Sequence, residues 1–461
     1  MEITLIIAVA TVAIFSVFIS PKAKDSGAFF KGLSPEGKAP GLLLLTFSQV
    51  TTWIFARSLL NAAILGFYYG VWGTLAYAAY YLSFLTGAKI IDSVRFQHGF
   101  DSIQAFLIDR FGRWGTRCYN FVIGVRLVSE VFANILVIGI LFGVAGGTAY
   151  TTAVALFAVV TLVYSMLGGL HASLRTDLFQ MLLFLLLLGA LTVLVLATGQ
   201  LTSAAIMFKS FAINDPGPIL ILVALLQIWS YPMHDPVMMD RGFIADRETT
   251  RKSFYHAAWI SFVCIMLFGS FGIIAGANAI DGEVMNATLM RILGETPMLL
   301  FNITLVISAM STLDSTLSSA SKLVAVDMRW IEPSVVNGRI TMAVFVLLGL
   351  LLVFSGNQDL FSAVAVSGTA SMYLAPVVFF SLWGRRTDIP LWSYLSCFFI
   401  SLAGAALYFT ESAGHTQFLG ESHKYTKLLG ISISVLLSGC LLFWVGMLSQ
   451  KHQPALRETA I

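Results

Sequence analysis

A dense run of hydroxyl side chains interrupts an apolar stretch between residues 307 and 321. These fifteen residues contain eight Ser or Thr side chains and one carboxylate, Asp314. Hydroxyl and carboxyl oxygens are the ligands that sodium and other hard cations prefer. On a helix, Ser311 shares a face with Asp314 and Ser315, which follow one turn later. Such hydroxyls can instead bond only to helical carbonyls or to neighbouring helices, but the density of this cluster favours a cation site.

Two other apolar stretches are broken by polar residues near their middle. The first carries Ser48 and Gln49 ahead of Trp53, and the second carries Gln227 ahead of Pro232. Inside a bilayer, unwound backbone is tolerated only where it lines a cavity or an ion site. We therefore expect a substrate pocket near the midplane, between the two breaks. The candidate pocket residues are Trp53, Ser58, Gln227, Trp229 and Tyr231. For any one of the aromatic residues, packing in the core is the alternative.

Two arginines are predicted to lie within the membrane, where cations are rare. Arg57 follows the first break, and Arg126 stands four residues before Glu130. That spacing places Arg126 and Glu130 on one helical face, so we expect a structural ion pair. Either guanidinium could instead hold a carboxylate of the solute. Both arginines are therefore candidate substrate-binding residues, and we hypothesise a solute with a carboxylate, such as an amino acid or an organic acid.

The sequence shows no pattern typical of an enzyme. The segment 234–248 is rich in charges of both signs, and we predict a solvated gate loop with salt bridges instead of a metal or catalytic cluster. No P-loop, Gly-x-Ser-x-Gly or His-Glu-x-x-His motif is present. The four cysteines lack metal-ligand spacing. We therefore expect neither hydrolysis nor ATP-driven transport.

The elements that must position these residues are membrane helices. Of 461 residues, 57% are hydrophobic and 11% are charged, and the mean hydropathy is +0.85. Because a soluble chain carries about 25% charged residues, lipid is the expected solvent, where a spanning helix needs about 20 apolar residues. We predict an all-α polytopic membrane protein with about thirteen transmembrane helices and a short outer helix or loop at 283–296. The predicted spans are about 3–20, 40–66, 71–92, 116–145, 149–168, 177–199, 217–233, 253–280, 298–327, 338–355, 360–384, 391–410 and 428–449.

The polar breaks also predict the internal organisation of the chain. They fall in the second and seventh spans, which are five apart, as in a 5+5 inverted-repeat core. We expect one transmembrane transporter domain over 1–461, with core repeats at about 40–199 and 217–384. Because the stretch 3–20 lacks the basic start and the cleavage site of a signal peptide, we expect it to be a retained helix. The helices expected to be peripheral are 3–20, 391–410 and 428–449.

The basic residues predict the orientation in the membrane. With the N-terminus outside, nineteen of the 27 Lys and Arg residues fall in inner loops, four fall in outer loops, and four lie within or at the ends of spans. Positive charge gathers on the cytoplasmic side of membrane proteins. We therefore predict a multi-pass protein of the cell (inner) membrane with its N-terminus outside and its C-terminus in the cytoplasm. The basic residues form no extended run, so no nucleic acid partner is expected.

Four segments in order resemble motifs of one family of carriers. Ser311-Thr312-Leu-Asp314-Ser315 resembles the sodium motif of the sodium:solute symporter family, which includes sodium/proline, pantothenate, sialic acid and glucose carriers. The other three segments are Gly168-Gly169 with Thr176-Asp177 and Gln180, Gly99-Phe-Asp-Ser with Asp109-Arg110-Phe111-Gly112, and Ser48 with Thr51-Thr52-Trp53 and Tyr69-Gly70. Thirteen spans with the N-terminus outside are also similar to the bacterial members. The resemblance covers nearly the whole chain.

This resemblance implies a leucine-transporter-like fold that holds Na⁺ between the second and ninth spans. It implies hydroxyl ligands from Ser311 and Thr312, and carbonyl ligands from Ser308, Thr51 and Ile54. It also implies a second sodium site in some members, which here would comprise Ser311, Asp177, Asp314 and Ser315. Since a buried carboxylate can bind sodium or carry a proton, Asp314 leaves the number and identity of the coupling ions open.

The function predicted on these grounds is sodium-coupled import of a small organic solute by alternating access. The partners would be the solute and the lipid bilayer, and we expect no obligate protein partner. A proton-coupled or uncoupled carrier of the same fold is the first alternative. A solute sensor that uses a transporter fold is the second.

Overall fold

The structure is a computed structural model that describes residues 2–34, 36–143, 145–202, 205, 208–355 and 367–451. Within these ranges the ordered elements are helices, and no strand occurs. The longer helices are α1 (Glu2–Ile19), α3 (Leu42–Trp53), α4 (Ala56–Ala79), α6 (Ile103–Phe142), α7 (Thr148–Ala197), α9 (Pro216–Gln227), α11 (Arg247–Ala277), α13 (Glu295–Lys322), α14 (Val335–Phe354), α17 (Leu391–Ser412) and α18 (Lys424–Lys451). The shorter ones are α2 (Ser26–Lys31), η1 (Tyr80–Leu82), α5 (Ser83–Ile91), η2 (Asp92–Gln97), η3 (Tyr231–His234), α10 (Pro236–Gly242), α12 (Met285–Leu293), η4 (Leu323–Asp327), α16 (Leu374–Pro376) and η5 (Val377–Trp383).

Eight helices in the described ranges are long and apolar enough to cross a membrane, and four shorter apolar helices accompany them. Three of the long helices turn sharply at a glycine with positive φ, namely Gly70, Gly112 and Gly169. At Gly169 a Cβ atom would lie 2.5 Å from the carbonyl oxygen of Phe29, so only glycine fits this turn. With these turns the helices correspond to the thirteen predicted spans, although residues 360–366 of the eleventh lie outside the described ranges. The predicted outer element at 283–296 contains α12.

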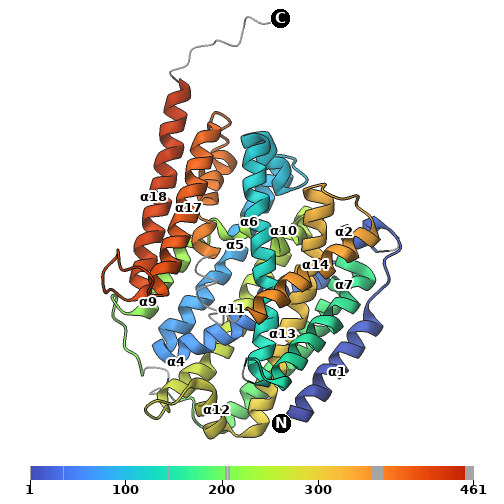
Figure 1. The fold of residues 1–461 in the computed structure, drawn as a ribbon, viewed down its shortest axis with the longest axis vertical. Helices are drawn as coiled ribbons and strands as arrows, with labels where there is room; N and C mark the ends of the chain where they lie inside the picture. Colours follow the sequence, from blue (N-terminus) through green and yellow to red (C-terminus); the bar gives the residue numbers. More distant parts are fainter. Residues whose placement is uncertain are drawn as a thin grey trace, which may run out of the picture.

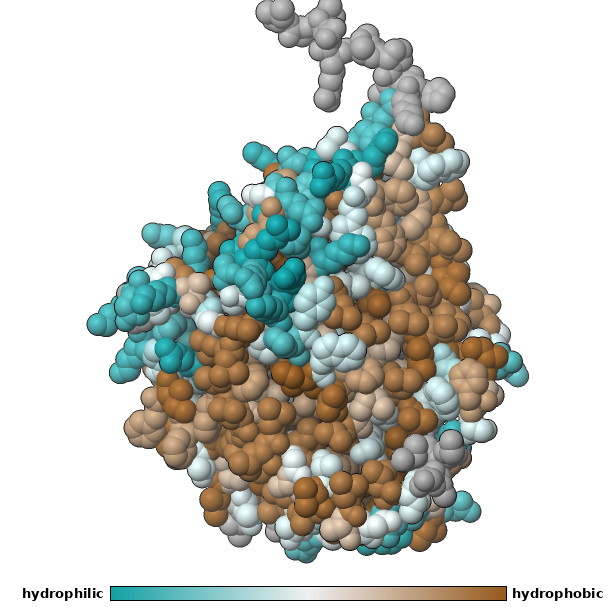
Figure 2. Space-filling view, turned by 180° about the vertical axis from the view of Figure 1, so that it is seen from behind, coloured by the Kyte–Doolittle hydropathy of each residue, from teal (hydrophilic) through white to brown (hydrophobic). Residues whose placement is uncertain are grey.

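The surface agrees with a protein surrounded by lipid. Figure 2 shows a broad hydrophobic band, with hydrophilic residues gathered mainly at the upper end of the molecule. Large apolar side chains point outward along the outer helices, for example Phe18, Leu186 and Leu437. In Figure 1, α1 starts at the lower end and α18 ends at the upper end, as an odd number of crossings requires. The chain is therefore an all-α multi-pass membrane protein, and the side that faces the cytoplasm stays a prediction from the basic residues.

The interior of the molecule is organised around α13. This helix packs against α3, α4, α6, α7, α10 and α14, and every residue from Thr304 to Ser321 is buried. Because so many of these residues are hydroxylic, α13 brings polar groups into the centre of an apolar protein. Such groups need partners on the neighbouring helices, and the two broken helices supply them.

Candidate cation and solute site

The first interruption lies between α3 and α4. Ile54 leaves the helical conformation with φ −79° and ψ 69°, and Phe55 is extended. The last carbonyls of a helix have no intrahelical donor, and side chains satisfy them here. The Trp53 carbonyl accepts a hydrogen bond from the Tyr81 hydroxyl at 2.7 Å. The Thr51 and Ile54 carbonyls point toward α13.

Hydroxyls of α13 meet these two carbonyls. Thr312 Oγ1 lies 3.3 Å from the Thr51 carbonyl oxygen, and Ser308 Oγ donates to the Ile54 carbonyl. The Ser308 carbonyl, expected to face a cation directly, also accepts a hydrogen bond from Thr312 Oγ1 at 2.8 Å. A cavity of about 10 Å³ opens here, and its lining includes Thr51, Ile54, Ser308 and Ser311. The structure thus brings together all five residues that the family resemblance implies as sodium ligands.

A second polar cluster surrounds Asp177 on α7. Its carboxylate accepts hydrogen bonds from Ser311 Oγ at 2.6 Å and from Ser48 Oγ at 2.5 Å. Ser315 Oγ lies 3.4 Å from both carboxylate oxygens. The Arg241 guanidinium from α10 completes the cluster, with Nη2 3.2 Å from Asp177 Oδ2. Ser311 therefore belongs to both polar clusters and connects them.

Asp314 lies on α13 beside this cluster but is not bonded to it. Its Oδ2 accepts a hydrogen bond from Thr176 Oγ1 at 2.7 Å, and its Oδ1 accepts none from the described residues. Within the described part of the chain, no hydrogen bond joins Asp314 to Asp177, Ser311 or Ser315. Of the predicted second sodium ligands, the structure groups Asp177, Ser311 and Ser315, with Asp314 set apart.

Four charged side chains meet behind the breaks. Arg126 Nη2 lies 2.6 Å from Asp235 Oδ2 and 3.1 Å from Glu130 Oε1, so the predicted pair with Glu130 is formed. Arg57 Nη2 lies 3.2 Å from the same Glu130 oxygen. All four side chains are buried, and their formal charges cancel. Each arginine thus has a carboxylate partner, so the group presents no net positive charge that would attract an anionic solute.

Asp235 also connects the two broken helices. Its Oδ1 accepts a hydrogen bond from the Met238 backbone N–H at the start of α10, and its Oδ2 accepts one from Trp53 Nε1 at 2.7 Å. Arg126 donates to the Tyr231 hydroxyl at 3.0 Å, within η3. One aspartate therefore fixes α10, the end of α3 and the guanidinium of Arg126 together.

A small aromatic cavity of about 20 Å³ lies beside these charges. Of the predicted pocket residues, Trp53, Arg57, Ser58 and Tyr231 line it. Its other lining residues are Phe55, Tyr77, Tyr80 and Tyr81. The three tyrosines follow one another closely on the third span, which was the available sequence signal for them.

The other predicted pocket residues lie around this cavity or away from it. Gln227 stands behind it and accepts a hydrogen bond from the Tyr80 hydroxyl at 3.0 Å. Arg126 does not line the cavity, but it donates a hydrogen bond to the hydroxyl of Tyr231, which does. Trp229 does not line it, since its ring packs against Phe379 and Trp383, with centroids 5.9 and 6.1 Å apart.

The prediction of a solvated loop over 234–248 is wrong for its first half. His234, Asp235, Asp240 and Arg241 are buried, because η3 and α10 continue into the protein after the break. Only the later part, which includes Arg247, is exposed. Arg241 and Asp235 are therefore site residues that were not predicted from the sequence. Their position just after the break in the seventh span was the only signal for them.

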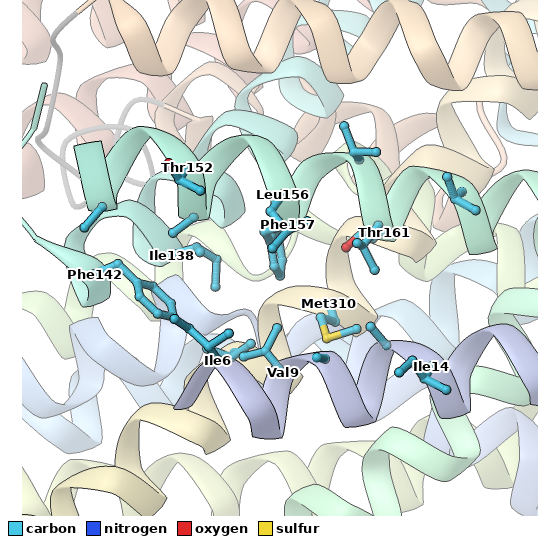
Figure 3. Close-up of a pocket in the computed structure, with 18 of the residues that line it drawn as sticks. Ile6, Val9, Ile14, Ile138, Phe142, Thr152, Leu156, Phe157, Thr161 and Met310 are labelled. Atoms are coloured by element: carbon cyan, nitrogen blue, oxygen red, sulfur yellow. The ribbon is translucent and has the colours of Figure 1, made fainter. Parts of the chain in front are cut away.

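A much larger hollow lies elsewhere, between α1, α6, α7 and α13 (Figure 3). Its volume is about 810 Å³, and residues such as Val9, Ile138, Phe157 and Met310 make its lining almost entirely apolar. It offers no charged group to a polar solute. Among the described residues, no group of three or more His, Cys, Asp or Glu side chains could hold a metal ion.

The arrangement defines a class of membrane protein. Two interrupted helices, α3/α4 and α9/η3/α10, lie against the hydroxyl-rich helix α13 in an all-α bundle. This is the leucine-transporter-like fold. No family model matches the chain, and no curated protein sequence matches it.

Three solved structures with the same fold are named as symporters or transporters. A Na⁺-coupled sialic acid symporter, in a substrate-bound outward-open state, is 13% identical and aligns with a TM-score of 0.74 over 96% of this chain and 97% of its own. The nucleobase-cation-symport-1 family transporter Mhp1, in a closed conformation with bromovinylhydantoin bound, is 15% identical, with a TM-score of 0.60 over 95% and 96%. A manganese transporter of Eremococcus coleocola is 14% identical, with a TM-score of 0.53 over 89% and 95%. At these identities the likeness is one of fold.

Proposed function

We propose that this protein is a sodium-coupled symporter of the sodium:solute symporter family, which imports a small organic solute by alternating access. The observation that carries the proposal is the meeting of the Thr51 and Ile54 carbonyls with the hydroxyls of Ser308 and Thr312 at the break between α3 and α4. The similar structure of a Na⁺-coupled sialic acid symporter supports it.

The chemistry of this cluster suits sodium. Its ligands would be carbonyl and hydroxyl oxygens, without sulfur or imidazole, as hard cations prefer. None of these five ligands carries an ionisable side chain. This first site therefore has no group that could bind and release a proton in place of sodium. The five ligands are Thr51, Ile54, Ser308, Ser311 and Thr312. A bound cation would hold the break to α13 and would thus link ion binding to the shape of the solute site. Each charge that crosses the membrane gains about 2.3 kcal/mol per 100 mV.

The charge balance behind the breaks bears on the solute. Arg57 and Arg126 already face Glu130 and Asp235, so an additional carboxylate would leave a buried excess of negative charge. A zwitterion or a neutral solute adds no net charge. Of the two solute classes suggested by the sequence, the amino acid is therefore favoured over the organic acid, and aromatic side chains such as Trp53 and Tyr231 would cover its apolar part.

The location and domain structure belong to the same proposal. The chain would act in the cell membrane with its N-terminus outside, as a single domain with core repeats over about 40–199 and 217–384. The breaks of α3/α4 and α9/α10 fall in the corresponding second and seventh spans.

A thermal-shift screen of the purified protein tests this function. Amino acids, organic acids, sugars and ureides are added in sodium or in choline buffer, because a ligand stabilises the folded state that binds it. We expect a neutral or zwitterionic compound to raise the melting temperature only with sodium. The effect should vanish in Thr312→Ala and persist in Thr304→Ala, whose hydroxyl donates to the Leu300 carbonyl of its own helix and, among the described residues, to no other group. Equal stabilisation in choline would support the uncoupled or proton-coupled alternative.

A further inference from the structure

The side chain of Arg241 is enclosed on every side within the described structure. It is 0% exposed, as is its partner Asp177. Nη2 lies 2.8 Å from Ser315 Oγ and 3.3 Å from Ser173 Oγ, and Nε lies 2.6 Å from Ser48 Oγ. Nη1 donates to the Val237 carbonyl at 3.0 Å. All three nitrogens are thus satisfied by oxygen atoms from α3, α7, α10 and α13.

The oxygens around Arg241 are those that would otherwise coordinate a metal cation. Asp177 and Ser315 contribute a carboxylate and a hydroxyl, and Ser48 and Ser173 add two more hydroxyls. A guanidinium is always charged in proteins, so it provides the positive charge that Asp177 requires. A second cation in the same buried place would meet strong repulsion, because like charges are poorly screened in a medium of low dielectric constant.

We propose that the second cation site is permanently occupied by Arg241, so that the protein binds one sodium ion and not two. Arg241 is in effect a cation attached to α10. This inference deepens the proposed function, since it concerns the stoichiometry of the same transport cycle, and it gives Ser311 a defined role. Ser311 donates to Asp177 and also lines the small cavity at the first site, so it connects the bound ion to the arginine that holds α10.

The test is the number of ²²Na⁺ ions bound by the purified full-length protein in detergent, without solute. Wild type should bind one ion. Arg241→Met removes the charge and should bind one more ion than wild type, while Arg241→Lys should keep the wild-type number. The additional ion should be lost again in Arg241→Met combined with Asp177→Asn.

The difference between the variant and wild type separates this inference from the proposed function. If wild type binds no sodium, the sodium-coupled function fails, but a gain of one ion in Arg241→Met still supports an arginine-filled second site. Two ions in wild type would overturn the inference without any variant. A monodisperse Arg241→Met or Arg241→Gln protein that binds no additional ion would also overturn it, and the Gln variant provides a second neutral side chain in case one of them does not fold.

Discussion

Thr312 on α13 and Thr51 on α3 meet across the break, with the Thr312 hydroxyl 3.3 Å from the Thr51 carbonyl oxygen. The two residues are 261 positions apart in the chain. Thr51 is near the end of a helix whose last carbonyls need partners, and Thr312 is on a buried helix rich in hydroxyl side chains. A cation between them would join the two halves of the proposed transport domain.

This relationship predicts the effect of changing the Thr312 hydroxyl. Thr312→Val keeps the shape but removes one oxygen of about five, so we expect the sodium concentration for half-maximal effect to rise at least about tenfold, which equals about 1.4 kcal/mol. Thr312→Ser should remain close to wild type. Sodium titration of the melting temperature measures both, with Thr304→Val as the matched control on the same helix. Unchanged sodium dependence in Thr312→Val would place the ion elsewhere.

The ion pair between Arg126 and Asp235 predicts strong energetic coupling. Removing one partner of a buried pair costs about 3–5 kcal/mol, because the other charge remains buried without compensation. Arg126→Ala and Asp235→Ala should each destabilise the protein strongly, and the double variant should cost clearly less than their sum. Thermal unfolding of all three variants gives the coupling.

An exposed ion pair provides the control for this cycle. Arg247 Nε lies 2.5 Å from Asp92 Oδ1, but the Arg247 side chain is 59% exposed. Arg247→Ala and Asp92→Ala should therefore each lower the free energy of unfolding by no more than about 1 kcal/mol. Equal losses at the buried and exposed pairs would show that burial of Arg126 has no energetic importance.

The balance of two arginines and two carboxylates predicts how solute preference can be changed. Glu130→Gln leaves the group of Arg57, Arg126 and Asp235 with one net positive charge. We expect inhibition of tracer uptake by an anionic analogue to strengthen at least tenfold relative to a neutral one. Gln227→Glu, behind the aromatic cavity, adds a negative charge and should act in the opposite direction. If neither variant alters the ratio of anionic to neutral inhibition, the charge balance does not select the solute.

Asp314 and Asp177 should respond differently to the same substitution. Asp177 is paired with Arg241, whereas Asp314 Oδ1 accepts no hydrogen bond from the described residues. Asp177→Asn should therefore destabilise the protein, because it leaves a buried guanidinium unpaired. Asp314→Asn should retain or raise the melting temperature in sodium-free buffer, since it removes a buried carboxylate that forms no ion pair within the described residues. A similar loss in both variants would contradict this assignment.

Regular helices explain which parts of the site the sequence could predict. Ser308, Ser311 and Thr312 lie on unbroken helix, so the ligand set that the family resemblance implies could be carried over residue by residue. Helical spacing predicted the pair of Arg126 and Glu130 directly, but it also grouped Asp314 with Ser311, which the structure does not. The glycine turns and polar breaks also leave local signals, so the number of spans could be predicted.

Contacts made beyond a break could not be predicted in this way. After Gln227 the chain passes through turns and η3 before α10 begins, so helical periodicity no longer indicates the direction of a side chain. Trp229 therefore points to Phe379 instead of the cavity. Arg241 reaches Asp177, 64 positions away, and Ser48, 193 positions away, and no local pattern encodes either contact.

Sodium-driven accumulation of the solute decides whether this protein is a sodium-coupled symporter. Purified protein is reconstituted in proteoliposomes, and uptake of the labelled solute found in the screen is followed under an inward gradient of sodium, of choline, or of protons without sodium. We expect transient accumulation of the solute above equilibrium only with the sodium gradient, and we expect this accumulation to be lost in Thr312→Val. Equal uptake in choline, or accumulation driven by protons alone, would contradict this expectation.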